Sequence, residues 1–238
     1  MPEHLYTIQK DVFTLFPDYV RGIIIAMDVK NCDSPKELID HLRMEENALR
    51  KQYKLDTLSG DKCIANWREA FRKFGAKPGE YRSSIESMAR RVLRGDSLPS
   101  INALVDIGNI ISLRYMMPVG GHAIDHIFGN LCLRIATGNE EFIPLGTNEI
   151  EYPQKGEVIF TDENIVLTRR WTWRQGNHTL TLPSTKSIEY NVDGLPPCEL
   201  FQVEKACNEL ADLLGKYCGG KIKIEMLSES HPTIPLAL

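Results

Sequence analysis

Apolar residues recur at two different spacings along this chain, and the spacing changes near residue 131. Between residues 61 and 115 they recur every three or four positions, which is the spacing of one face of an α-helix. After residue 131 they fall in short segments separated by turns rich in Gly, Pro and Asp, which is typical of β-strands. The pattern predicts a mainly helical first half and a sheet-rich second half.

The first half is predicted to contain one buried strand and four helices. Residues 19–29 are rich in β-branched side chains and predict the strand. Ser34 is expected to cap the following helix, with Glu37 reaching back, and that helix carries many charged residues. The other three helices are expected at residues 61–74, 84–93 and 101–115.

The second half is predicted to contain seven strands and one helix, which is expected at residues 196–217. The strands are expected at residues 131–136, 141–145, 157–161, 164–170, 178–182, 186–192 and 221–227. The tail from residue 228 onward is expected to be loose. Because no Pro/Ser-rich linker or break in composition divides the chain, residues 1–238 are expected to form a single domain.

The charge balance excludes a chain-wide attraction for nucleic acid. The protein has 238 residues and a formal net charge of −4, so RNA binding must come from a local basic surface. The densest basic region surrounds the helix at 84–93 and comprises Arg68, Arg72, Lys73, Lys77, Arg82, Arg90, Arg91 and Arg94. These side chains are either ordinary solvated surface or contacts for phosphates.

Cysteine usage and hydropathy predict a cytoplasmic protein. The six cysteines include no CxxC pair, so they are expected to be reduced thiols. Residues 1–10 have no apolar core and are not expected to be a signal peptide. The longest apolar run, residues 23–27, is too short to span a bilayer, and no membrane partner is expected.

Motifs for cofactors and metals are absent from the sequence. There is no Walker loop, no dinucleotide fingerprint and no nucleophile elbow, so no cofactor is expected. His122 and His126 are four residues apart, a spacing that can hold zinc on a helix. The glycines around them do not favour a helix, and no third ligand is marked, so the sequence predicts no metal site.

Two polar segments are candidates for ligand binding. Asn102, Asp106 and Asn109 share one face of an otherwise apolar helix, and they either lock neighbouring loops or face a ligand. Residues 169–176 (RRWTWRQG) predict a strand with Arg170, Thr172 and Arg174 on one face and both tryptophans on the other. Such a segment either stacks on a base and binds phosphate, or buries its tryptophans in the core.

Four stretches, taken together, resemble the editing and tRNA-binding module of the bacterial phenylalanyl-tRNA synthetase beta subunit, its third and fourth domains. They are residues 66–129, 133–146, 156–176 and 185–196, within a recognisable core of about 65–196. Within them, NALVDIGN at 102–109 matches an Asn-x-x-Val-Asp-x-x-Asn helix of the synthetase, and HAID at 122–125 resembles its His-Ala-Phe-Asp segment. The closest likeness is to the form of this module found as a separate small protein.

The resemblance implies an α+β fold of mixed sheet layers covered by helices. In the synthetase the module hydrolyses tyrosine wrongly attached to the phenylalanine tRNA. It implies a pocket between residues 102–125 and the strands of 156–191, with His122 as the catalytic residue. The implied pocket residues are Asn102, Asp106, Asn109 and Asp125. To these the sequence itself adds Trp171, Trp173 and Arg174 of the segment at 169–176, and Glu189. The candidate RNA-binding residues come from the basic region and from residues 169–176, and they are Arg82, Arg90, Arg91, Arg94 and Arg170.

The chain departs from the synthetase pattern at two places. The synthetase's Gly-Gly loop is replaced by RRWTWRQGNHT, and its pocket glutamate corresponds to about Asn191. Glu189 lies two residues away on the same face of the strand and substitutes only with a register shift. The favoured function is a tRNA-binding protein that hydrolyses misacylated tRNA in trans, with no ligase activity. The alternatives are a non-catalytic RNA-binding module and an amino-acid or small-molecule binding protein.

Overall fold

The computed structural model describes residues 4–237 and contains two β-sheets. The six-stranded sheet has the order β10-β1-β4-β5-β6-β7, and the four-stranded sheet has the order β3-β8-β2-β9. The first comprises β1 (Leu5–Ile8), β4 (Leu131–Ile135), β5 (Val158–Asp162), β6 (Ile165–Arg169), β7 (Arg174–Gln175) and β10 (Thr233–Pro235). The second comprises β2 (Val20–Met27), β3 (Val119–Ala123), β8 (Ser187–Gly194) and β9 (Lys221–Leu227).

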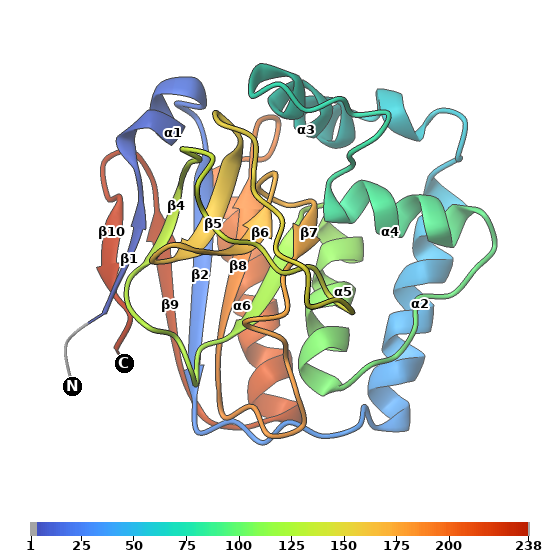
Figure 1. Ribbon diagram of the computed structural model, residues 1–238. Coiled ribbons are helices and arrows are strands. Elements are labelled where there is room, and N and C mark those ends of the chain that lie inside the picture. The colour runs from blue at the N-terminus through green and yellow to red at the C-terminus, as the bar shows by residue number, and fades with distance from the viewer. Residues whose placement is uncertain (1–3, 238) are drawn as a thin grey trace.

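The larger helices cover the outer face of the four-stranded sheet. Figure 1 shows α5 and α6 beside this sheet and α2 on the far side of α5. The helices are α1 (Lys10–Leu15), α2 (Lys36–Gln52), α3 (Lys62–Lys73), α4 (Ser84–Leu93), α5 (Ala103–Tyr115) and α6 (Leu200–Tyr217), with a 3₁₀ turn at Leu58–Gly60. Within residues 4–237, none of them is both long and apolar enough to cross a membrane.

The central strand β2 is buried on both faces. Ile24 and Ala26 pack into the core beneath the helices, while Ile23 and Ile25 pack into a second core that includes side chains of the six-stranded sheet. A strand that is covered on both sides has apolar residues at successive positions. This is why residues 19–29 predicted a buried strand. The four-stranded sheet is therefore the middle layer of the molecule.

The α+β fold class is confirmed. The six-stranded sheet is mixed, because β1 and β4 are parallel while its other pairs are antiparallel, and the four-stranded sheet is antiparallel throughout. Helices α2 to α6 and strands β2, β4, β5, β6, β8 and β9 lie where they were predicted, with ends shifted by a few residues. The short elements β1, α1, β3 and β10 were not predicted.

The expectation of a loose tail was wrong for the described part of that segment. β10 pairs with β1, because Ile234 and Leu236 insert alternate apolar side chains into the core that the two sheets share. Residue 238 lies outside the described part. The strands expected at 141–145 and 178–182 were also wrong: the first makes only isolated bridges, and the second is irregular.

Ser34 does not cap α2, whose N-cap is Pro35 without a side-chain cap. The Ser34 hydroxyl instead donates to Asp106 Oδ2 at 2.6 Å. Because the helix begins at Lys36, Ser34 lies one residue before the capping position, so the predicted capping box does not form. This contact ties the start of α2 to α5.

Candidate functional site

One face of β8 presents polar side chains to the six-stranded sheet. Residues two apart on a strand share a face, so Glu189, Asn191 and Asp193 point one way, and the alternate apolar residues pack beneath the helices. On the neighbouring strand β3, His122 pairs with Glu189 and Gly120 pairs with Asn191. A polar layer therefore lies between the two sheets.

A cavity of ≈ 110 Å³ opens at this layer, and we name it the polar cavity. It lies between β3, the end of β8 and the connection from β6 to β7. Its lining residues are Ser84, Pro118, Val119, Gly120, His122, Thr168, Trp171, Thr172, Trp173, Arg174, Gln175, Asn191 and Asp193. Hydroxyl, amide, carboxylate and guanidinium groups thus face one small space.

His122 is a buried, neutral imidazole. Burial lowers the pKa of His122 to about 3, with smaller contributions from the charges of Arg21 and His178. Nδ1 lies 2.7 Å from the Thr179 hydroxyl oxygen, and Nε2 lies 3.2 Å from the Thr168 hydroxyl oxygen. The two hydroxyls fix the ring, and at neutral pH the ring can accept a proton through one nitrogen only.

The backbone at Gly120 comes too close to Asn191 for a side chain. A Cβ atom at Gly120 would lie 2.7 Å from Asn191 Oδ1. Because Cβ atoms do not approach other heavy atoms so closely, any larger residue at Gly120 would force the Asn191 amide to move. Glycine at this position allows β3 to pair with β8 and leaves the cavity open.

A second cavity of ≈ 310 Å³ adjoins the first, and we name it the apolar cavity. Val119, Gly120 and Gln175 line both. The remaining lining residues of the apolar cavity are Ile101, Leu104, Val105, Gly108, Asn109, Gly121, Leu145, Leu180, Thr181 and Tyr190. Aliphatic side chains dominate this wall, so the two adjoining cavities differ in polarity.

The polar row on α5 divides between structural and cavity-facing roles. Asn102 is the N-cap of α5, accepts from the N–H of Val105 at 3.0 Å and donates to the Thr181 carbonyl at 3.1 Å. Asp106 is fully buried and accepts hydrogen bonds from Ser34, Ser100 and the backbone N–H of Ile101. Asn109 lines the apolar cavity.

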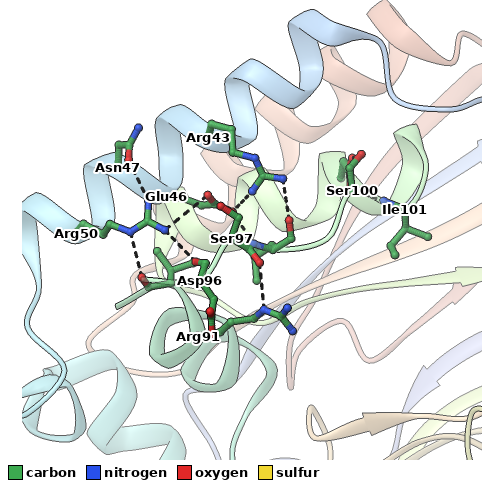
Figure 2. Close-up of polar contacts among 12 residues, drawn as sticks. Arg43, Glu46, Asn47, Arg50, Arg91, Asp96, Ser97, Ser100 and Ile101 are labelled. Carbon is green, nitrogen blue, oxygen red and sulfur yellow. Dashed lines mark hydrogen bonds and ion pairs between the residues drawn. The ribbon is translucent and has the colours of Figure 1, made fainter. Parts of the chain in front are cut away.

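The segment of residues 96–101, which leads into α5, is held by α2 and α4 (Figure 2). The buried Glu46 carboxylate accepts from a backbone N–H of this segment at 2.7 Å. Arg43 and Arg50 of α2 donate to two of its carbonyl oxygens at 2.8 and 2.9 Å, and Arg91 of α4 donates to a third at 3.1 Å. These contacts fix the approach to the apolar cavity.

The strand expected to continue through residue 170 and beyond ends at Arg169, and a turn replaces it. Arg170 and Trp171 have φ values of 45° and 62°, which breaks the alternation of side chains. The turn lets the Trp171 ring pack into the core, at 4.7 Å from the Phe16 ring and 5.1 Å from the Trp67 ring. The predicted division into an arginine face and a tryptophan face was therefore wrong.

Three cations around this turn differ in how freely they can meet a ligand. Arg170 is buried, with its guanidinium carbon 3.7 Å from the Tyr81 ring centre and 4.6 Å from that of Trp173. Arg169 is buried against Glu157 at 2.9 Å. Arg174 has a side chain 40% exposed and lies at the rim of the polar cavity. Of the three, Arg174 is accessible.

Glu189 and Asp125 lie outside the lining of both cavities. Glu189 is fully buried, and burial raises its pKa to about 8, while the nearby charge of Arg21 acts in the opposite direction. Neither of its carboxyl oxygens has a hydrogen-bond partner among residues 4–237. Asp125 is exposed and accepts from the backbone N–H of Lys186 at 3.2 Å.

The basic region around α4 is organised by a buried carboxylate. Glu86 contacts Arg68 and Arg90 at 2.8 Å each and Arg82 at 3.8 Å. Arg91 and Arg94 are exposed on the same helix and its C-cap. Part of the positive charge predicted to bind RNA is thus balanced internally by Glu86, while Arg91 and Arg94 remain exposed.

Several residues of the polar cavity were missed from the sequence. Thr168 lies in a strand where threonine is ordinary, so no local pattern marked it, while Thr172 and Gln175 belong to the candidate segment at 169–176 but were not among the predicted pocket residues. A signal for Asp193 was present, because it continues the alternate polar positions of β8 beyond residue 191. In residues 4–237 no three His, Cys, Asp or Glu side chains gather in a way that would hold a metal.

Comparison with known proteins places this geometry in context. The family model described as the B3/4 domain matches residues 66–219. The phenylalanine–tRNA ligase beta subunit of Mycoplasma genitalium is 27% identical over 101 residues, which cover 42% of this chain and 12% of that protein. A crystal structure of an N-terminal fragment of the phenylalanyl-tRNA synthetase beta subunit from Pyrococcus horikoshii superposes with a TM-score of 0.46 at 16% identity. That superposition covers 91% of this chain and 49% of the fragment, so the chain spans only part of each relative.

Proposed function

The chain belongs to the B3/4 domain family, and from this membership we propose that it binds the aminoacylated end of a tRNA and hydrolyses the ester in trans. In this proposal it is a proofreading hydrolase of the cytosol, without ligase activity. The observation that carries the proposal is the extent of the family match. Every residue that lines the polar or the apolar cavity lies within residues 66–219.

The two cavities offer separate places for the two parts of an aminoacyl group. The apolar cavity of ≈ 310 Å³ is suited to an aliphatic or aromatic side chain, and the polar cavity is suited to the atoms around the ester. An apolar pocket discriminates by roughly 1–3 kcal/mol for each methylene group gained or lost. Selection among amino acids would therefore rest on the shape of the apolar cavity.

The hydrolysis itself requires an oriented water and donors for the developing oxyanion. In the proposal, the Thr168 hydroxyl, held by His122 Nε2 at 3.2 Å, orients the water. The water oxygen adds to the ester carbonyl, the bond to the ribose oxygen breaks, and the proton passes to that oxygen. Arg174 at the rim supplies positive charge to the oxyanion or to the terminal phosphates. The products are a free amino acid and a tRNA.

A panel of misacylated tRNAs tests this function. The wild-type protein is expected to release the amino acid from at least one member of the panel. His122→Ala is expected to slow that release about tenfold or more, because the threonine hydroxyls lose their common partner. His126→Ala is the matched control, since His126 is exposed on the same segment and should leave the rate unchanged.

The other outcomes of the assay separate the alternatives. Salt-sensitive tRNA binding without ester loss would support a non-catalytic RNA-binding module instead. Absence of tRNA binding even at low salt would contradict both RNA functions and leave an amino-acid binding protein.

A further inference from the structure

Two residues that line the polar cavity carry acceptor atoms that the rest of the protein leaves unused. Asp193 is 1% exposed and Thr172 is 7% exposed, and both line the cavity. Among residues 4–237, neither Asp193 Oδ2 nor Thr172 Oγ1 has a hydrogen-bond partner. Buried polar atoms are normally paired, so two such atoms on residues that line one small cavity indicate a place for a ligand that donates hydrogen bonds.

Asp193 is held in place by its other carboxylate oxygen. Oδ1 accepts from Arg21 Nε at 2.7 Å and from the Tyr19 hydroxyl. Arg21 in turn donates through Nη1 to the Tyr6 hydroxyl at 2.7 Å. The carboxylate therefore cannot rotate to satisfy Oδ2 elsewhere without breaking this network. Its free oxygen is a fixed acceptor.

The chemistry of the acceptors selects the donor group. A carboxylate accepts only, and a hydroxyl and an amide oxygen, here those of Thr172 and Asn191, can accept as well. A primary ammonium carries three donors and a positive charge, and a charge-assisted hydrogen bond to a carboxylate is the strongest contact available here. The volume of ≈ 110 Å³ holds such a group with its carbon and an adjoining carbonyl.

We infer that Asp193, Thr172 and Asn191 form a subsite for the α-ammonium group of an aminoacyl ligand. This inference rests on the proposed function for the identity of the ligand and deepens it by assigning its orientation. The ammonium enters the polar cavity, the carbonyl lies toward Arg174 at the rim, and the side chain passes by Gly120 into the apolar cavity. Acylation of the amino group removes the charge and blocks entry.

Binding of small amides to the full chain tests the subsite without requiring hydrolysis. L-leucinamide retains the ammonium, 4-methylpentanamide lacks it, and N-acetyl-L-leucinamide blocks it. By NMR titration, L-leucinamide is expected to bind at least about tenfold more tightly than either analogue. Thr172→Val should weaken the binding of L-leucinamide by about three- to tenfold and leave the binding of 4-methylpentanamide unchanged. Thr14→Val, at an exposed hydroxyl, is the control and should change the binding of neither compound.

The variants and outcomes keep this inference separate from the function on which it rests. Asp193→Asn should abolish the preference for the ammonium. Because this substitution also disturbs the contact with Arg21, Thr172→Val is the decisive variant. Equal binding of L-leucinamide and 4-methylpentanamide, or binding of neither, overturns the subsite. Ester hydrolysis without a preference for the ammonium would support the proposed function and contradict the subsite. Ammonium-selective binding without hydrolysis would support the subsite and contradict the proposed function.

Discussion

Glu189 is a buried carboxyl group whose ionisation opposes folding. Burial raises the pKa of Glu189 to about 8, whereas an exposed glutamate titrates near 4.3. The folded state therefore holds a proton that the unfolded state releases, and the free energy of unfolding falls as the pH rises from about 4.5 to about 8. Glu189→Gln should remove this fall and be more stable than the wild type by on the order of 3 kcal/mol at pH 8 to 9.

Urea unfolding at a series of pH values measures this difference. At pH 4.5 to 5 the variant and the wild type are expected to be nearly equal, because Glu189 is then protonated in the folded protein. Glu149→Gln, at an exposed carboxyl, is the control and should give parallel curves. A Glu189→Gln curve that stays parallel to the wild type would show that Glu189 ionises normally in the folded protein.

Within α5, two polar residues less than one helical turn apart have different surroundings. Asp106 is fully buried and accepts three hydrogen bonds, so Asp106→Ala leaves three donors unpaired and should lower the free energy of unfolding by about 2–4 kcal/mol. Asn109 lines the apolar cavity, and Asn109→Ala should change stability by less than about 1 kcal/mol. Denaturant midpoints with unchanged slopes would measure both. Equal losses would contradict the division of roles within the polar row.

β10 is a short strand that anchors the end of the chain. Ile234 is 2% exposed and packs in the core shared by the two sheets. Ile234→Ala should therefore cost about 2–4 kcal/mol of stability, while His231→Ala, at an exposed position, should be nearly neutral. Thermal or urea unfolding checks the pair. If Ile234→Ala proves neutral, the tail contributes no packing and the original expectation of a loose segment stands.

The longer elements were predictable because their own residues carry the periodic signal. The run at residues 23–27 marked β2, and helical spacing marked α2 to α6, since each buries a wide apolar face. β1 and β10 have only four and three residues, and their partners lie more than 100 residues away. No local pattern can identify such a pairing.

Part of the candidate site was visible in the sequence, and part depends on tertiary contacts. His122 and Asn109 could be marked as polar residues in unusual positions, and both line a cavity. The turn at Arg170 and Trp171 could not be foreseen, because neither is a residue that favours positive φ. Packing of Trp171 in the core and stacking of Arg170 on Tyr81 hold that conformation, and both contacts come from distant segments.

The distribution of charge limits how this molecule can bind RNA. The chain carries a net charge of −4, and the buried Glu86 is surrounded by Arg68, Arg82 and Arg90. Arg170 is buried as well, so its predicted contact with RNA would require the turn to open. If the protein binds tRNA as proposed, the exposed cations near α4 are the expected phosphate contacts, and the attraction should be sensitive to salt.

Arg91 and Arg94 are the exposed arginines at the end of α4, and they are the predicted phosphate contacts that the protein leaves most accessible, although Arg91 also donates through Nε to the Ser97 carbonyl. Each phosphate contact releases counterions, so Arg91→Ala/Arg94→Ala should weaken tRNA binding and reduce the slope of log affinity against log salt by up to about two. Lys36→Ala/Lys221→Ala, at exposed lysines outside α4, is the charge-matched control and should leave the slope unchanged. Filter binding between about 50 and 200 mM salt measures this slope, because several phosphate contacts have a large effect on affinity over that range. Equal losses in both double variants would mean that binding follows net charge alone, with no RNA-binding surface at α4.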